Sequence, residues 1–556
     1  MSRTLRRPAF LRTNLPALLL PALLLVVFAA HDAHAQHSVA TRPDAWGRRF
    51  WLAFPPNTGS GVNEITELHL AIRALEPATV TITSFDRDSS ITVKAGTGTS
   101  ATIVKLERSF AGMLDLAPLE LRSRKSFLVE STADVTISAL SLRTVSSDAM
   151  LVLPEGMLGS QYVVLAWPNG LRRDGDSLTY DMASQFAIIA TEDGTSVTIV
   201  PGESDVAPET LTMARGDVYL DEAPLGRPAD VSGASIRSSR PVAVLAGNRR
   251  AGVPSDRGNF RDHLLEQLIP IERWGSEAVA TPLYAVAGVT DTARLRVIAA
   301  EAGTLSVDGR EYPLRACGVL ELPLDRPMHL RADVPFEAAV FERSGGYDAD
   351  RIALLADPSM MLVVPTRALD TVAHFESFDH DYFFEHYATI VATAAVPGLE
   401  LDGSEVDPTF VRVGETELYV AHMPLAAGSH VISGMTPFAV YAYGFGEAIS
   451  YAYPAGFSDR SSTSRAGADA EPARRARLTV SPMPATHAVR VELAGYQRGT
   501  VTIEIIDGLG KRWQSEVLNG RTDVLVQFAG APGGIYICRA VDGSGVIATI
   551  PVIVAR

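Results

Sequence analysis

One short segment of the sequence gathers residue types that bind metals. Residues 378–387 hold two histidines, His380 and His386, among three carboxylates and several aromatic rings. Imidazole and carboxylate groups are ligands for divalent metal ions. On a strand the two histidines share a face but stand about 20 Å apart, too far to hold one ion without a bend. The aromatic residues favour a junction between modules with solvated charges, and metal binding stays open.

Two other patterns resemble ligand-binding motifs. Arg215-Gly216-Asp217 is an integrin-type tripeptide, which would mark attachment to cells if a tight turn presented it. Asp174 and Asp176, with Asp181 nearby, offer hard oxygen ligands suited to calcium. The full twelve-residue calcium loop is missing, so a solvated turn is favoured there. The tripeptide also arises by chance in a chain rich in Arg, Gly and Asp.

Catalytic motifs are absent from the sequence. It contains no H-E-x-x-H pair, no nucleophile elbow with Ser-His-Asp order, no phosphate loop and no dinucleotide fingerprint. We therefore assign no catalytic, cofactor-binding or metal residue and expect a protein that is not an enzyme. Two alternatives remain: an exported hydrolase whose site is not visible in the sequence, and a structural cell-envelope protein.

The composition limits the classes of protein to which the chain can belong. The chain has 556 residues, of which 20% are charged and 47% hydrophobic, so several folded domains are expected. A net charge of −15 argues against nucleic-acid binding. Two cysteines exclude a disulfide scaffold. We expect Cys317 and Cys538 to be unpaired and to act as small apolar residues in strands.

The N-terminus has the pattern of an export signal. Four arginines precede the apolar residues 14–30, and Ala33-His34-Ala35 matches a cleavage site. Residues 1–35 are therefore predicted to be a signal peptide, with a mature chain beginning at Gln36. No later apolar run approaches the ~20 residues that a transmembrane helix needs. The prediction is a secreted protein without a transmembrane span in its mature chain.

The body of the chain repeats one sequence of elements four times. An opening segment runs into a strand, a strand–turn–strand unit follows, and a polar turn then leads into a long alternating strand. The fixed order predicts an all-β fold of tandem β-sandwich-like modules, with a four-bladed propeller as the alternative. The strand–turn–strand units are 67–83, 186–200, 295–309 and 388–403, and the long strands are 128–142, 236–248, 330–343 and 432–445. The predicted modules are 36–150, 151–268, 269–364 and 365–456.

The C-terminal part is organised differently. Residues 457–476 are small, polar and charged, which is typical of a linker. Residues 477–556 alternate over about seven short strands, which suits a small separate β-sandwich.

The opening segments share one apolar position. Trp274 stands before Gly275 in the third copy, as Trp46 stands before Gly47 in the first, and leucine takes this place in the other two copies (Leu158 and Leu369). A position that accepts only large apolar residues indicates a core plug. We therefore predict that Trp274 is buried.

Two stretches resemble known families. Residues about 44–365 resemble the N-terminal domain family of the IgGFc-binding protein, found in bacterial surface proteins and a mucosal animal protein. The matching pieces are 46–55 (WGRRFWLAFP), 147–154 (SDAMLVLP), 158–162 (LGSQY), 186–195 (FAIIATEDGT), 230–236 (DVSGASI), 240–248 (RPVAVLAGN), 263–270 (HLLEQLIP) and 274–275 (WG). The resemblance implies binding or adhesion without catalysis, and it does not imply antibody as the ligand. We carry over none of these residues as ligand contacts.

Residues about 477–556 resemble the C-terminal sorting domain of type IX secretion substrates. The matching pieces are 480–485 (VSPMPA), 506–511 (IDGLGK) and 533–537 (GGIYI), with Met483 where the family usually has Asn. The resemblance implies passage through the outer membrane by the type IX machinery, removal of the tail, and attachment to the cell surface or release. Together the two resemblances predict a secreted, non-catalytic adhesion protein with an extracellular protein or glycan as its ligand.

Overall fold

The structure is a computed structural model. It describes residues 45–58, 66–96, 100–107, 122–174, 177–202, 207–254, 260–284, 292–345, 357–396, 398–456, 458, 477–482, 485–494, 501–507, 511–518, 522–528, 530–542 and 545–555. The predicted signal peptide and almost all of the predicted linker lie outside these residues. Among the described residues, no helix has the length and apolar character that crossing a membrane requires.

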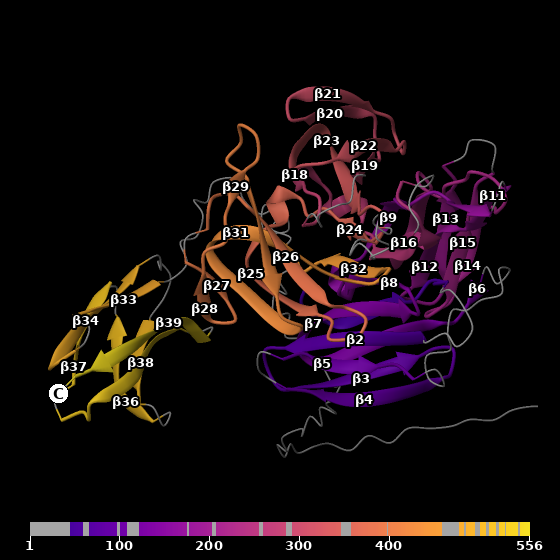
Figure 1. Cartoon of the computed structure of the whole chain (residues 1–556). Coiled ribbons are helices and arrows are strands. Elements are labelled where there is room, and N and C mark those ends of the chain that lie inside the picture. The colour runs from indigo at the N-terminus through magenta and orange to yellow at the C-terminus, as the bar shows by residue number, and fades with distance from the viewer. Residues whose placement is uncertain are drawn as a thin grey trace, which may run out of the picture. The chain divides into compact units, whose positions relative to one another are not determined.

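The described residues form an almost purely β structure, as predicted (Figure 1). The first sheet has the strand order β4-β3-β7-β2-β5, and β1 and β8 also pair with β7. Its strands are β1 (Gly47–Ala53), β2 (Thr66–Ala74), β3 (Ala78–Ser84), β4 (Ser89–Ala95), β5 (Thr102–Lys105), β7 (Ser126–Arg143) and β8 (Ser146–Val152).

The second sheet repeats this arrangement around β16. Its order is β14-β13-β16-β12-β15-β6, and β9 and β17 also pair with β16. A separate hairpin joins β10 (Gly170–Asp174) to β11 (Ser177–Met182). The strands of the sheet are β6 (Arg122–Ser123), β9 (Gly159–Val163), β12 (Ser184–Ala190), β13 (Thr195–Val200), β14 (Glu209–Met213), β15 (Val218–Glu222), β16 (Ser235–Ala251) and β17 (Asp262–Gln267).

The third sheet has the order β21-β20-β23-β19-β22, with β18 and β24 also on β23. Its strands are β18 (Gly275–Ala280), β19 (Ala293–Ala299), β20 (Gly303–Val307), β21 (Arg310–Leu314), β22 (Leu320–Leu324), β23 (Met328–Phe341) and β24 (Met360–Leu362). The third sheet therefore has the same connectivity as the first.

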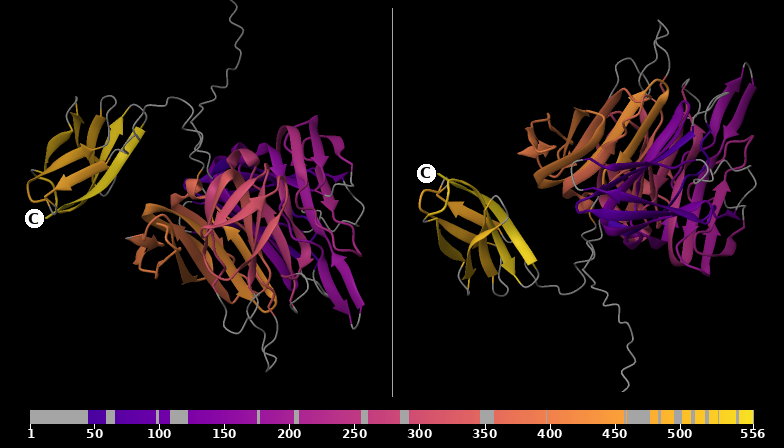
Figure 2. Two further views of the ribbon diagram at one scale, coloured as in Figure 1. Left: turned by 90° about the horizontal axis from the view of Figure 1, so that it is seen from above. Right: turned by 90° about the horizontal axis from the view of Figure 1, so that it is seen from below.

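The fourth sheet has the order β28-β27-β31-β26-β30-β29, with β25 and β32 also on β31. Its strands are β25 (Asp370–Ser377), β26 (Glu385–Ala392), β27 (Leu399–Leu401), β28 (Ser404–Val406), β29 (Val411–Arg412), β30 (Tyr419–Leu425), β31 (Gly428–Gly446) and β32 (Ile449–Pro454). Figure 2 shows all four sheets from two further sides.

One long strand organises each sheet, namely β7, β16, β23 or β31. In β7 the N-terminal half pairs with β1 and β3, and the C-terminal half pairs with β2 and β8. The burial pattern also changes along the long strands: the first half of β31 is mostly half-buried, with Met435 exposed, and its second half is buried throughout. A strand buried on both faces must be apolar nearly continuously, which explains runs such as Val242–Ala246 in β16. The strand–turn–strand units predicted from the sequence form β2 and β3, β12 and β13, β19 and β20, and β26 and β27. In each unit the two strands lie on either side of the long strand.

Short 3₁₀ helices connect successive sheets: η1 (Glu155–Met157), η2 (Ile271–Arg273) and η3 (Thr366–Ala368). A proline stands before each of them and packs on a glycine at the start of the preceding sheet. A Cβ on any of these glycines would overlap the proline ring, so only glycine fits. The pairs are Gly47 with Pro154, Gly159 with Pro270 and Gly275 with Pro365.

Residues 477–555 contain a small sandwich with a core of its own. One sheet has the order β33-β34-β37 and the other β36-β35-β38-β39, and their apolar core includes Val491, Ile503 and Val552. This confirms the predicted small C-terminal sandwich. Its strands are β33 (Arg477–Ser481), β34 (Ala488–Ala494), β35 (Val501–Ile506), β36 (Arg512–Leu518), β37 (Asp523–Gln527), β38 (Gly534–Asp542) and β39 (Gly545–Val554).

The two cysteines are free, as predicted, but only one fits the predicted setting. Cys538 is buried in β38. Cys317 is half-buried in the turn between β21 and β22, with a left-handed φ of 55°, so its placement in a strand was wrong. Its N–H donates to the carbonyl of Ala299 at 2.8 Å, which fixes the turn against β19.

Trp274 is a core plug, as predicted. Its side chain is only 5% exposed, and its indole N–H donates to the carbonyl of Ile269 at 2.9 Å. Leu158 and Leu369 are buried at the same position of their copies, and Trp46 is half-buried against His374. We expect Trp274→Ala to lower the free energy of unfolding by roughly 3–5 kcal/mol, because it removes a buried ring and leaves a cavity. A melting curve of the protein measures this loss.

The matched control for Trp274→Ala is Phe384→Ala, which removes a large aromatic ring that is 61% exposed. That variant should melt near the temperature of the unmodified chain. Equal melting temperatures for the two variants would contradict the assignment of Trp274 as a core residue.

Candidate functional site

The metal-like segment does not assemble into one site. His380 Nε2 lies 3.5 Å from Glu67 Oε2, which His69 Nε2 also approaches at 2.9 Å. His386 instead points into the fourth sheet, where its Nδ1 lies 2.9 Å from the hydroxyl of Tyr451. In the part of the chain that the structure describes, no three or more His, Cys, Asp or Glu side chains are grouped to hold a metal ion. The segment joins the first and fourth sheets at the Glu67–His380 contact.

The integrin-type tripeptide is part of a packed turn. The guanidinium of Arg215 lies 5.4 Å from the ring centroid of Trp51 and 5.8 Å from that of Phe85. Gly216 is buried with φ +82°, and any side chain there would overlap the Phe85 ring. Because Arg215 is held on two aromatic rings, the turn does not project the tripeptide as a free loop.

The calcium-like pattern is only partly described. Asp174 ends strand β10, while Gly175 and Asp176 lie outside the described residues. Asp181 lies on β11, where its Oδ1 is 3.4 Å from Arg261 Nη1. Asp181 is thus engaged by a cation of the protein itself.

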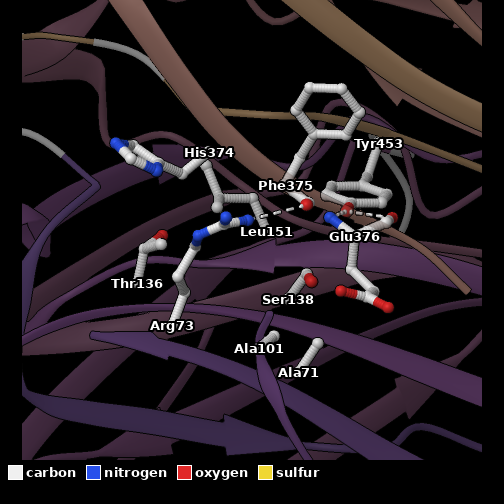
Figure 3. Close-up of a pocket in the computed structure, with 10 residues that line it drawn as sticks. All are labelled: Ala71, Arg73, Ala101, Thr136, Ser138, Leu151, His374, Phe375, Glu376 and Tyr453. Carbon is white, nitrogen blue, oxygen red and sulfur yellow. Dashed lines mark hydrogen bonds between the residues drawn. The ribbon is translucent and has the colours of Figure 1, made fainter. Parts of the chain in front are cut away.

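A small pocket lies between the first and fourth sheets (Figure 3). Arg73 reaches into it from β2 and donates from Nη1 to the carbonyls of Phe375 (3.3 Å) and His430 (2.9 Å). The Tyr453 hydroxyl donates to the carbonyl of Glu376 at 2.7 Å. The cavity volume is about 10 Å³, room for about one water molecule and far below the ~300–1,000 Å³ of typical small-molecule sites. Arg73 thus donates to main-chain carbonyls across the junction, Tyr453 donates to one within the fourth sheet, and the Glu376 carboxylate contacts the Ser429 hydroxyl.

Burial shifts the pKa values of the ionisable residues that line this pocket. Removal from water lowers the pKa of Arg73 and raises that of Glu376, while their mutual attraction opposes both shifts. The pKa of His374 falls to about 4, first because of burial and second because of the charge on Arg73. At neutral pH His374 is therefore an uncharged ring, and its edge meets the Trp46 ring at a centroid distance of 5.1 Å.

A buried carboxylate gathers the four strands β8, β17, β24 and β32, which we call the central strands. Asp148 on β8 accepts from the N–H of Ala149 (2.9 Å) and of Ala452 on β32 (3.2 Å) through Oδ1. Its Oδ2 accepts from Leu265 on β17 and Met360 on β24, both at 3.0 Å. Complete burial raises the pKa of Asp148 well above its usual range, and the four amides oppose that shift.

Asp262 adds a second link between the central strands. Its Oδ1 accepts from the N–H of Ser147 and from that of His263 (2.8 Å), and its Oδ2 accepts from Ser450 at 2.8 Å. Burial raises its pKa well above the usual range. Asp357 is buried nearby, and its pKa is raised by burial and by the charge of Asp262. The sequence analysis missed this cluster entirely.

Successive sheets are also joined in one recurring way. The backbone N–H just after a central strand donates to a side chain of the next sheet, so each junction has a fixed register. The pairs are Leu153 to Gln267 (2.9 Å), Ile269 to Glu337 (3.0 Å) and Val364 to Tyr441 (3.0 Å). Each of these buried side chains accepts from a main-chain N–H of the preceding sheet, and these bonds stabilise the assembly of the sheets.

Three stacked tyrosines lead from the interior to the surface between the third and fourth sheets. Tyr284 follows β18, Tyr387 lies on β26 and Tyr443 on β31. The Tyr284 and Tyr387 ring centroids are 5.1 Å apart with a 21° interplanar angle, and those of Tyr387 and Tyr443 are 5.6 Å apart with 20°. Tyr443 is fully buried, whereas Tyr284 is 49% exposed. Of these three tyrosines, only Tyr387 lies in the segment 378–387 that the sequence analysis singled out.

Comparison with known proteins identifies what the chain is similar to. The family model described as IgGFc binding protein matches residues 148–444. The human IgGFc-binding protein is 26% identical over 343 residues, which are 58% of this chain and 6% of the human protein. The chain thus spans only a small part of that relative's length.

Solved structures show weaker likenesses. The BSP domain of a biofilm-associated protein has 8% identity and a TM-score of 0.15, covering 51% of this chain and 82% of that one. A tetra-tandem repeat from the extending region of a large adhesion protein has 11% identity and a TM-score of 0.12, covering 76% and 95%. At these TM-scores neither likeness supports a conclusion.

The buried carboxyls predict how stability depends on pH. Burial raises the pKa of Glu337 from 4.5 to about 8. Between these values the folded chain keeps the proton that the unfolded chain releases, so stability falls as pH rises and levels off above about 8. Glu337→Gln keeps an oxygen that accepts from Ile269 and removes this titration. The variant should therefore gain stability relative to the parent by about 1.4 kcal/mol per pH unit across this window.

Urea unfolding of the parent and the variant at pH 5, 6, 7 and 8 tests this expectation. Glu311→Gln, at an exposed position of the same sheet, is the matched control. A constant difference between Glu337→Gln and the parent from pH 5 to 8 would show that Glu337 is not protonated in the fold.

Proposed function

This chain belongs to the IgGFc-binding protein family, and we propose that it is an extracellular binding or adhesion protein that acts without catalysis. The family match covers more than half of the chain and includes the second, third and fourth sheets almost completely. The human relative is named for binding the Fc part of IgG. For this chain we propose a protein or glycan ligand, which the surface of the modules would hold.

The coordination of Asp148 is the observation that carries this proposal. A catalytic carboxylate needs access to a substrate and a proton to exchange with it. Asp148 is fully buried, and its oxygens accept from four main-chain amides. Asp262 accepts from three main-chain amides in a similar way, and Glu337 accepts from one. Asp148 and Asp262 therefore support an assembly role, and the proposal places ligand contact at the surface.

The proposal includes the chain's organisation and route. Residues 1–35 would be the signal peptide, and 477–556 would be a sorting domain for a type IX-like route. A linker would span 457–476. The four β modules would be 36–150, 151–268, 269–364 and 365–456. The separate core of the C-terminal sandwich supports a removable unit.

Binding without turnover is tested with the full secreted chain. The immobilised chain is exposed to human IgG Fc, mucin and fibronectin, each before and after enzymatic deglycosylation. We expect saturable binding to at least one of them, with the mass of the bound protein unchanged after overnight incubation. Cleavage or modification of the bound protein at a rate proportional to the amount of chain would instead favour the exported hydrolase.

The export route predicts the composition of the mature protein. In the native host the chain should be recovered outside the outer membrane and should lack residues 477–556. Mass spectrometry of the surface and medium fractions measures both ends of the chain. A product that keeps its C-terminal sandwich and stays in the periplasm would contradict the type IX-like route and would leave the binding function untouched.

A further inference from the structure

The Tyr284 ring is held by its neighbours and open on one side. One face stacks on Tyr387, yet the residue is still 49% exposed. With one face covered by Tyr387, a ligand would approach the opposite ring face. A large aromatic ring that stays exposed on a rigid support is available to stack on a ligand.

The neighbours fix this ring before any ligand arrives. The Tyr284 backbone N–H donates to the Tyr443 hydroxyl at 3.1 Å, and the N–H of Leu283 donates to Glu342 Oε2 at 3.3 Å. Tyr387 is fixed in turn, because its hydroxyl donates to Glu385 Oε2 at 2.6 Å. A ring that is already ordered loses little conformational entropy on binding, so its contact area contributes more fully to affinity.

Two polar side chains lie beside the tyrosine stack, Glu385 at Tyr387 and His422 at Tyr284. The Glu385 carboxylate accepts from Tyr387 and has lone pairs for further donors. The His422 ring lies edge-on to Tyr284 with centroids 6.0 Å apart, and its Nδ1 is 2.8 Å from Thr389 Oγ1. Nε2 is then the remaining hydrogen-bonding group of the imidazole. Burial lowers the pKa of His422, so the imidazole is uncharged at neutral pH.

We propose that Tyr284, Glu385 and His422 form a binding site for a neutral sugar ring of a glycan. A pyranose has an apolar C–H face that matches an aromatic ring and hydroxyls around its edge that match a carboxylate and an imidazole. The carboxylate repels acidic sugars, which selects a neutral one. This inference rests on the proposed binding function and names the class of its ligand.

The test uses the full chain on an array of immobilised neutral and sialylated glycans. The unmodified chain should bind neutral glycans and bind their sialylated forms less. Tyr284→Ala should weaken binding at least tenfold, while Tyr284→Phe, which keeps the ring, should stay within about threefold. Tyr312→Ala removes a half-buried tyrosine of the third sheet and should leave glycan binding unchanged. Melting curves of all variants check the fold.

Each other outcome overturns the proposal. Equal binding by Tyr284→Ala and the parent would remove Tyr284 from the site, and a preference for sialylated glycans would contradict the charge argument. If the chain binds no glycan on the array but binds deglycosylated proteins, the ligand is not a glycan and the proposed binding function still stands. If the chain binds neither the glycans nor the proteins, the proposed function is refuted as well.

Discussion

The Asp148 carboxylate accepts hydrogen bonds from strands that are far apart in the chain. Ala452 stands 304 positions after it, yet both belong to the same cluster of central strands. A buried carboxyl without partners costs several kcal/mol, and here four amides from four sheets satisfy it together. The four sheets are therefore energetically linked: if any one were absent, a buried oxygen would lose a donor. The body should fold as one cooperative unit despite its repeated architecture.

The three junctions between sheets that are consecutive in sequence are built alike, and the junction between the fourth and first sheets is built differently. Sheets consecutive in sequence meet through a glycine under a proline and an N–H donated forward, as at Gly275 and Pro365. The fourth sheet meets the first without a connecting segment of this kind. There the Arg73 guanidinium binds two carbonyls of the fourth sheet instead. A long cationic side chain suits this task because it spans the junction and places several donors at its tip.

Local patterns explain what the sequence predicted. Strand alternation, turn residues and the position of Trp274 depend on neighbours in the chain, so the all-β fold, the repeated strand pairs and the buried tryptophan were predictable. The central cluster was not, because Asp148 and Asp262 resemble ordinary polar residues of strands. One signal was present in the sequence: Asp262 and Asp357 each stand eight positions before a proline that opens a module. The tyrosine stack joins residues from β26 and β31 to Tyr284, and no local pattern reports such a contact.

The same geometry explains where ligand contacts belong in such a fold. The centre is filled by side chains that bind the protein's own main chain, and the second halves of the long strands are buried on both faces. Side chains that are both exposed and rigid therefore occur where one sheet supports a residue of the next. Tyr284 meets this condition, since the third sheet supplies the residue and the fourth supplies the rings and the hydroxyl that hold it. A surface of this kind exists only when the sheets are assembled, so the central carboxylates that join the sheets also keep the exposed ring in place.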